Sequence, residues 1–136
     1  MTTHATSTFE VKSWDEKPYD EVAGSKIKLT KASVRQSFHG DIEGEGQVEY
    51  LMAYCDDGTA SFVGLLRVAG MLGNRSGSFV LQTAGTDDGN ATKATWFVVP
   101  GTATGDLVGL RGEGGFSASR TETLPATLDY DLMPAA

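Results

Sequence analysis

The sequence has little of what catalytic, metal-binding and disulfide-stabilised proteins depend on. Its 136 residues include a single cysteine, Cys55, and only two histidines, His4 and His39. A disulfide within the chain is therefore impossible, and a zinc site would lack the three or four converging ligands that it needs. The glycine-rich stretch 101–115 lacks the Gly-Lys-Ser/Thr of a phosphate loop. We expect no metal and no cofactor, and a single cysteine fits a cytoplasmic protein.

Basic residues and long apolar runs are also scarce. There are 18 Asp and Glu residues against 11 Lys and Arg, which gives a net charge of -7. Nucleic acids and anionic membranes are recognised by basic patches, so this balance argues against both as partners. No run approaches the ~20 apolar residues of a membrane-spanning helix. The N-terminus has neither the basic start nor the apolar run of a signal peptide.

Glycine is the abundant residue, with 17 copies that fall mostly between short apolar runs. Such spacing predicts many short strands joined by tight turns. The length fits a single domain over residues 1–136. The segment 15–23 is expected to form an irregular loop or a helical turn. Eight strands are predicted, over residues 5–14, 26–38, 46–55, 60–70, 76–85, 91–99, 107–118 and 124–132.

The strongest local signal is the pair Asp57-Gly58, which stands between two alternating runs. It predicts a hairpin with a two-residue turn, in which Glu49 lies opposite Leu66. Further turns follow along the chain, so the strands form a meander. Eight strands in a meander tend to close, because closure removes exposed edges. The predicted fold is all-β: a closed eight-stranded antiparallel barrel with up-and-down topology.

One face of this meander mixes large apolar side chains with glycines, as expected for a tapering barrel interior. We assign it to the lumen and predict that it binds a small apolar or aromatic molecule. The predicted binding residues are Leu51, Phe62, Leu66, Phe79, Leu81, Thr83 and Trp96. The opposite face is too apolar to stand in water, which predicts a homo-oligomer or a covering segment. That face carries Tyr50, Met52, Tyr54, Val63, Leu65 and Val80.

Glu49 is the candidate catalytic residue. In the predicted register it points into the lumen beside Leu66. A carboxylate in apolar surroundings is a stronger base than one in water, and such a base abstracts protons from carbon in isomerases, cyclases and eliminating lyases. The alternative is a strand-end residue exposed at the rim or paired with an arginine, the commoner environment of a charged side chain. Trp96 has two interpretations as well, a wall for a flat ligand or a core residue.

Several segments of the chain resemble a bacterial family known only as domain-of-unknown-function family 3224. They are residues 9–14, 64–68, 73–82 and 105–116. The run 99–112 is also similar, mainly in its glycine spacing, to a region of the allene oxide cyclases and dirigent proteins. These resemblances imply an eight-stranded barrel, often oligomeric, whose lumen holds an apolar small molecule.

The chain departs from the family pattern at the pocket. The family has Glu where this chain has Leu66, and His where it has Thr83, and both positions are predicted on one face of adjacent strands. A Glu and a His side by side would form an acid/base pair, so an activity that depends on this pair is not carried over. Phe97 is also bulkier than the small polar residue typical of the family. The changes indicate a remodelled pocket, natural or engineered.

Three functions stay open at this point. The first is an enzyme that uses a Glu general base without metal, of isomerase or lyase type. The second is a barrel that binds a ligand without chemistry, which the missing Glu/His pair favours. The third is a structural barrel whose lumen is filled by core side chains.

Overall fold

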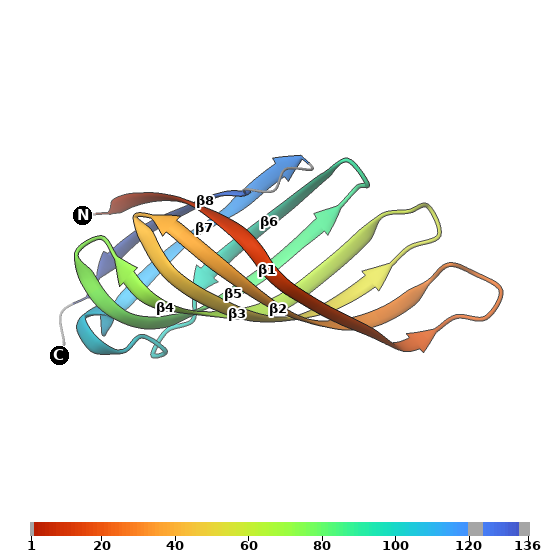
Figure 1. The fold of residues 1–136 in the computed structure, drawn as a ribbon, viewed down its shortest axis with the longest axis horizontal. Coiled ribbons are helices and arrows are strands. Elements are labelled where there is room, and N and C mark those ends of the chain that lie inside the picture. Colours follow the sequence, from red (N-terminus) through yellow and green to blue (C-terminus); the bar gives the residue numbers. More distant parts are fainter. Residues whose placement is uncertain (1, 120–123, 134–136) are drawn as a thin grey trace.

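The structure is a computed structural model that describes residues 2–119 and 124–133. Within these residues the chain forms eight antiparallel strands and one short 3-10 turn (Figure 1). The strands are β1 (Thr3–Glu21), β2 (Lys28–Gly40), β3 (Ile42–Tyr54), β4 (Ala60–Leu72), β5 (Arg75–Asp87), β6 (Ala91–Val98), β7 (Leu110–Ser119) and β8 (Leu124–Leu132), with η1 (Gly105–Leu107) between β6 and β7. The prediction of an all-β meander of eight antiparallel strands is confirmed. No helix in this part of the chain is long and apolar enough to cross a membrane.

The sheet closes on itself. Each strand pairs with the next along the chain, and the first part of β1, from Thr3 to Phe9, pairs with β8 from Tyr130 to Leu124. The pairings therefore form a hydrogen-bonded ring. Beyond Phe9, β2 is the only strand that pairs with β1 among the described residues. Within the described residues the ring is thus complete at one end, whereas at the other end β1 pairs with β2 alone.

The length of β1 corrects the prediction of a loop over residues 15–23. The strand continues to Glu21, which pairs with Lys28 of β2, and its register shifts twice, between Val11 and Ser13 and between Pro18 and Asp20. A charged segment that contains a proline resembles a loop in sequence. On an edge strand, however, charges, bulges and proline are tolerated and prevent further pairing. The β1–β2 hairpin extends beyond the other turns (Figure 1).

The register between β3 and β4 corrects a second prediction. Glu49 lies opposite Leu65, not opposite Leu66. The side chains of a strand alternate between two faces, so a shift of one residue moves the whole set of β3 to the other face. Tyr50 and Met52 consequently lie inside the ring, whereas Glu49 and Leu51 are exposed on the outside. The predicted inner face of β4, β5 and β6 is confirmed by the burial of these strands.

The turn between β3 and β4 explains the shift. Cys55 N–H donates to the carbonyl oxygen of Thr59 at 2.9 Å, which leaves a three-residue loop between them. A two-residue type I′ turn would need positive φ at both central residues. Gly58 has a φ of 89°, but no residue other than glycine has a positive φ in the described chain. The Asp57-Gly58 pair therefore belongs to a three-residue loop, in which glycine takes the left-handed position.

The two ends of the ring interior are filled differently. At the end that holds the β2–β3 and β4–β5 turns and η1, which we call the packed end, large side chains are at most 2% exposed. They are Phe38, Ile42, Leu72, Phe79, Leu107 and Leu110. The β6–β7 loop is bound to β5 there, because Thr104 N–H donates to the carbonyl oxygen of Ser78 at 2.8 Å. At the opposite end, the open end, the hairpins splay apart (Figure 1).

Candidate functional site

A cavity of about 230 Å³ lies inside the open end. Its lining comes from all eight strands. The lining residues are Phe9, Val11, Trp14, Gln36, Tyr50, Met52, Phe62, Asp87, Thr92, Phe116 and Leu124. Val11 and Trp14 are 41% and 47% exposed, so the cavity reaches solvent beside β1. Its volume corresponds to roughly eight water molecules, enough for one small organic molecule.

Five of the eleven residues that line the cavity are aromatic. On one side the ring centroids of Trp14 and Tyr50 are 6.1 Å apart. Tyr50 in turn packs edge to face on Phe62, with 5.2 Å between ring centroids. On the other side Phe9 packs edge to face on Phe116, also at 5.2 Å. Burial raises the pKa of Tyr50 to about 12, so its hydroxyl group stays protonated at neutral pH. Such walls suit a flat or apolar ligand.

Three polar side chains interrupt this wall. Gln36 is only 3% exposed, and its carbonyl oxygen Oε1 has no hydrogen-bond partner among the described residues. Asp87 Oδ2 accepts a hydrogen bond from the Thr92 hydroxyl at 3.0 Å, and Asp87 Oδ1 accepts one from the N–H of Gly89 at 2.7 Å. A few polar groups in an apolar pocket are the usual means of orienting a ligand.

A second polar cluster holds Trp14 in place. Glu16 Oε1 accepts a hydrogen bond from Trp14 Nε1 at 2.9 Å. Its Oε2 accepts hydrogen bonds from the hydroxyls of Thr30 at 2.5 Å and Tyr54 at 2.6 Å. Burial alone would raise the pKa of Glu16, but these hydrogen bonds and the nearby charge of Lys28 outweigh it and hold the pKa below its ordinary value. The carboxylate thus stays ionised and links β1 to β2 and β3.

Tyr54 and Lys28 complete this cluster. Burial, followed by the hydrogen bond and charge of Glu16, raises the pKa of Tyr54 to about 12. Lys28 Nζ lies 4.9 Å from the centroid of the Tyr54 ring. The only lysine in this cluster is therefore engaged with an aromatic face and a carboxylate beside the cavity, and it does not line the cavity.

Glu49, the predicted catalytic residue, does not reach the interior. Its side chain is exposed on the outer face, where Oε1 accepts a hydrogen bond from the Ser33 hydroxyl at 2.8 Å. The prediction that Glu49 lies in apolar surroundings was wrong, because it depended on a two-residue turn at Gly58. Leu51 shares this correction and is 49% exposed.

The remaining predicted residues lie inside the ring, but only Phe62 lines the cavity. The other five are buried core residues deeper in the ring: Leu66, Phe79, Leu81, Thr83 and Trp96. Trp96 Nε1 donates to the carbonyl oxygen of Thr127 at 2.9 Å, as a core tryptophan would. Leu66 and Thr83 do lie on the inner face of adjacent strands, because Gly64 pairs with Thr83. Thr83 Oγ1 is buried without a hydrogen-bond partner in the described chain.

Gln36 and Asp87 were not predicted as site residues. In β2 the even-numbered positions from 30 to 38 are all buried, and Gln36 is the one amide among them. A glutamine at a core position of an alternating strand is a signal that the sequence did carry. Asp87 gave no such signal, because an Asp-Asp-Gly sequence is typical of an ordinary turn.

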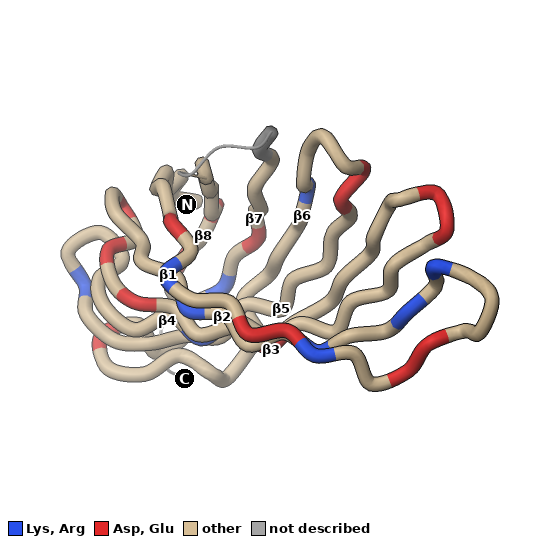
Figure 2. The backbone as a smooth tube through the Cα atoms, turned by 45° about the vertical axis from the view of Figure 1, so that its right-hand side comes forward, with Lys and Arg blue, Asp and Glu red and all other residues tan. Residues whose placement is uncertain are grey.

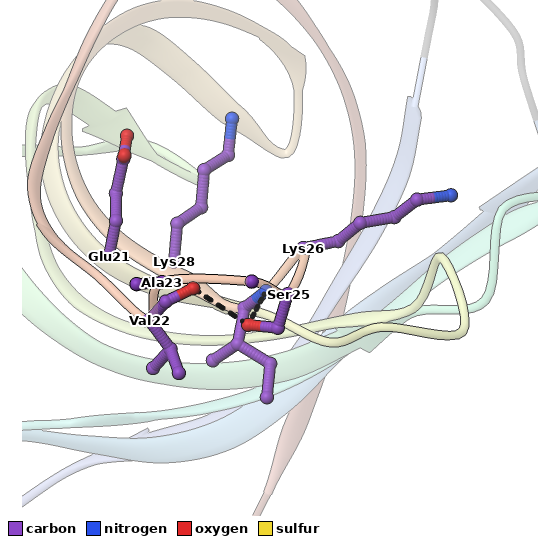
Figure 3. A pocket seen from close by; sticks show the side chains of 8 residues that line it. Glu21, Val22, Ala23, Ser25, Lys26 and Lys28 are labelled. Atoms are coloured by element: carbon purple, nitrogen blue, oxygen red, sulfur yellow. Dashed lines mark hydrogen bonds between the residues drawn. The ribbon is translucent and has the colours of Figure 1, made fainter.

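Other surface features add no chemistry. No group of three or more His, Cys, Asp or Glu side chains among the described residues is arranged to hold a metal ion. His4 is hydrogen-bonded to Asp129 at 2.5 Å, and His39 to Glu43 at 3.0 Å, both on the exposed surface. The hollow in Figure 3 is formed by the β1–β2 turn alone, where the Ser25 hydroxyl donates to the carbonyl oxygen of Val22 at 2.9 Å. We therefore assign no function to that hollow, which is the concave side of the turn.

Comparisons with known proteins agree with the fold and are silent on activity. The family model described as "Protein of unknown function (DUF3224)" matches residues 5–130. A solved structure from Shewanella oneidensis MR-1, described as a protein with unknown function from the DUF3224 family, is 29% identical in sequence and superimposes with a TM-score of 0.79. The match covers 99% of this chain and 100% of that chain. No curated protein matches the chain.

Proposed function

The chain belongs to the DUF3224 family of proteins of unknown function, and we propose that it is a binding module for a small apolar or aromatic molecule. The observation that supports this function is the aromatic-walled cavity of about 230 Å³ at the open end. A structural protein whose interior served only as core would gain stability by filling such a space, because empty volume costs packing energy. The cavity instead holds polar groups placed among apolar walls.

The ring of strand pairings supports the further proposal that the fold is a closed barrel with its binding site at one mouth. The resemblance to the allene oxide cyclases stays a prediction. A cytoplasmic location also stays a prediction, based on the single cysteine.

Catalysis is the second candidate function, and its candidate base is Asp87 in place of Glu49. Asp87 is the one acidic residue that lines the cavity within the described chain, whereas Glu49 is on the outer face. Proton abstraction from a bound carbon acid would therefore fall to Asp87 as general base, with the aromatic walls positioning the substrate. Both oxygens of the Asp87 carboxylate already accept a hydrogen bond, and no residue among the described lining is arranged as a partner acid for it. Binding without chemistry is the function that we favour.

A pair of substitutions on β6 tests the binding proposal. Thr92 lines the cavity, whereas Thr95 on the same strand is exposed on the outer face. Thr92→Phe fills the cavity, and Thr95→Phe adds the same side chain outside the ring. Binding of small aromatic fragments, measured by saturation-transfer NMR and titration calorimetry, is expected in the parent and in Thr95→Phe, and at least tenfold weaker in Thr92→Phe. Equal binding by the two variants, or none by the parent at millimolar fragment, would exclude the cavity as a binding site.

A further inference from the structure

We propose that the ligand of this cavity is a small organic cation, an aromatic or alkyl ammonium compound, whose charged group lies against Asp87 and whose apolar part lies between the aromatic rings. This inference rests on the proposed binding function and specifies its ligand. The starting observation is the charge of the lining. Of the eleven lining residues Asp87 is the one with a charged side chain, and none is Lys, Arg or His.

Asp87 is placed to accept further hydrogen bonds. It is the last residue of β5, on the inner face, and the two hydrogen bonds that it accepts go one to each carboxylate oxygen. A carboxylate oxygen can accept two hydrogen bonds, so each has capacity left for an ammonium group. None of the ion pairs in the described chain involves Asp87. Among the described residues, Asp87 is thus a negative charge at the cavity wall without a cationic partner, and such a charge favours a cationic ligand.

Gln36 supplies the second acceptor. Its amide is hydrogen-bonded to the Tyr50 hydroxyl, whereas its carbonyl oxygen Oε1 is buried and has no partner in the described part of the chain. Buried acceptors almost always have a donor, from the protein, from water or from a ligand. A ligand with N–H groups satisfies this oxygen, whereas an anionic ligand would place a second acceptor against it.

The aromatic walls favour the same kind of ligand. The faces of Trp, Tyr and Phe rings attract cations through their negative centres, and a partly desolvated site strengthens this attraction. Trp14, Tyr50 and Phe62 form one continuous aromatic wall. Acidic residues also lie at the tips of the β3–β4 and β5–β6 turns of the open end (Figure 2). Together with the net charge of -7, they lower the electrostatic energy of an approaching cation.

Three probes of similar size and different charge test the inference. They are phenethylammonium, 2-phenylethanol and phenylacetate, which share a phenyl ring and a two- or one-carbon chain. We expect phenethylammonium to bind about tenfold more tightly than 2-phenylethanol, and phenylacetate to bind more weakly than either. Equal affinity for the cation and the neutral alcohol would overturn the inference and leave the binding function standing. Failure of all three probes to bind would overturn both.

Two substitutions in one turn locate the effect. Asp87→Asn removes the charge at the cavity and keeps the size of the side chain. Asp88→Asn removes the same charge from the next residue, which is exposed and accepts hydrogen bonds from the N–H groups of Asn90 and Ala91. We expect the preference for the cation over the alcohol to fall to about twofold in Asp87→Asn and to be unchanged in Asp88→Asn. If both variants keep the preference, the charge that selects the cation is not Asp87 and the inference is wrong. Binding of 2-phenylethanol to each variant reports that the cavity is intact.

Discussion

The packed end and the open end of the ring are built from the same eight strands, yet one is filled and the other is hollow. At the packed end large apolar side chains such as Phe79 and Leu107 are at most 1% exposed. At the open end the interior holds Gln36 and Asp87, and Trp14 is 47% exposed. The pairings of β2 with β3 and of β3 with β4 run along the length of these strands and reach both ends, so pairing alone does not decide which end is filled.

The tightly packed interior and the cavity proposed as the binding site therefore lie at opposite ends of the ring. The core cluster extends along the whole ring: its large members at the packed end are at most 2% exposed, whereas Tyr50, Met52 and Phe62 are 6–9% exposed and line the cavity. The open end includes the part of β1 that, among the described residues, pairs with β2 alone, and Glu16 joins this part to Thr30 of β2 and Tyr54 of β3. Ligand sites are commonly found on such less stable parts of a rigid scaffold.

The largest effect is expected from the packed end. Phe79→Ala removes a fully buried ring and leaves a cavity, so we expect a loss of about 3–5 kcal/mol in the free energy of unfolding. Val11→Ala at the rim of the open end, where the side chain is 41% exposed, is the matched control and should cost about 0.5 kcal/mol or less. Urea denaturation followed by circular dichroism gives both values. Similar losses in the two variants would mean that the ends do not differ in their share of the stability.

A medium effect is expected at the Glu16 cluster, which links the two regions. The pKa of Glu16 in the folded state is below its ordinary value of 4.5, so its stabilising contribution is full above pH 4.5 and is lost as the pH falls through the lowered pKa. Glu16→Gln should therefore lower the free energy of unfolding by about 1–2 kcal/mol at pH 7, a modest figure because solvent partly screens the hydrogen bonds. The cost should be much smaller in strong acid, where Glu16 itself is protonated. Thermal unfolding from pH 7 to pH 2.5 measures the difference. A constant difference across this range would show that the charge of Glu16 does not matter.

The fold could be predicted from the sequence more fully than the site. Alternation and turn residues predicted the eight strands and their order, and the cost of exposed edges predicted that the sheet closes. The register failed at one place, because Asp57-Gly58 suits a two-residue turn and a three-residue loop equally well. That single residue moved Glu49 out of the interior and Tyr50 into it.

The site could not be predicted because its parts are brought together by pairing over long distances in the chain. Gln36 and Asp87 lie 51 positions apart in the sequence and meet only in the closed ring.

The smallest effect on stability is expected on the outer face, where apolar side chains are not part of the core. We propose that the chain forms a homo-oligomer through an outer apolar patch, defined here as Leu51, Val63, Leu65 and Phe97, each 44–55% exposed. Two of the residues predicted for this face, Tyr50 and Met52, are inside the ring, so the patch is a corrected version of the predicted surface. Apolar patches on a sheet face commonly mark association.

Sedimentation velocity at micromolar concentration should show an oligomer for the parent and a monomer for Leu65→Glu. The free energy of unfolding of the Leu65→Glu monomer should lie within about 0.5 kcal/mol of that of the parent, measured at a dilution at which the parent is also a monomer. Val108→Glu, which changes an exposed valine far from the patch, should remain oligomeric. A parent that sediments as a monomer would contradict the proposal. The cavity at the open end would then be the one interaction site proposed for the described chain.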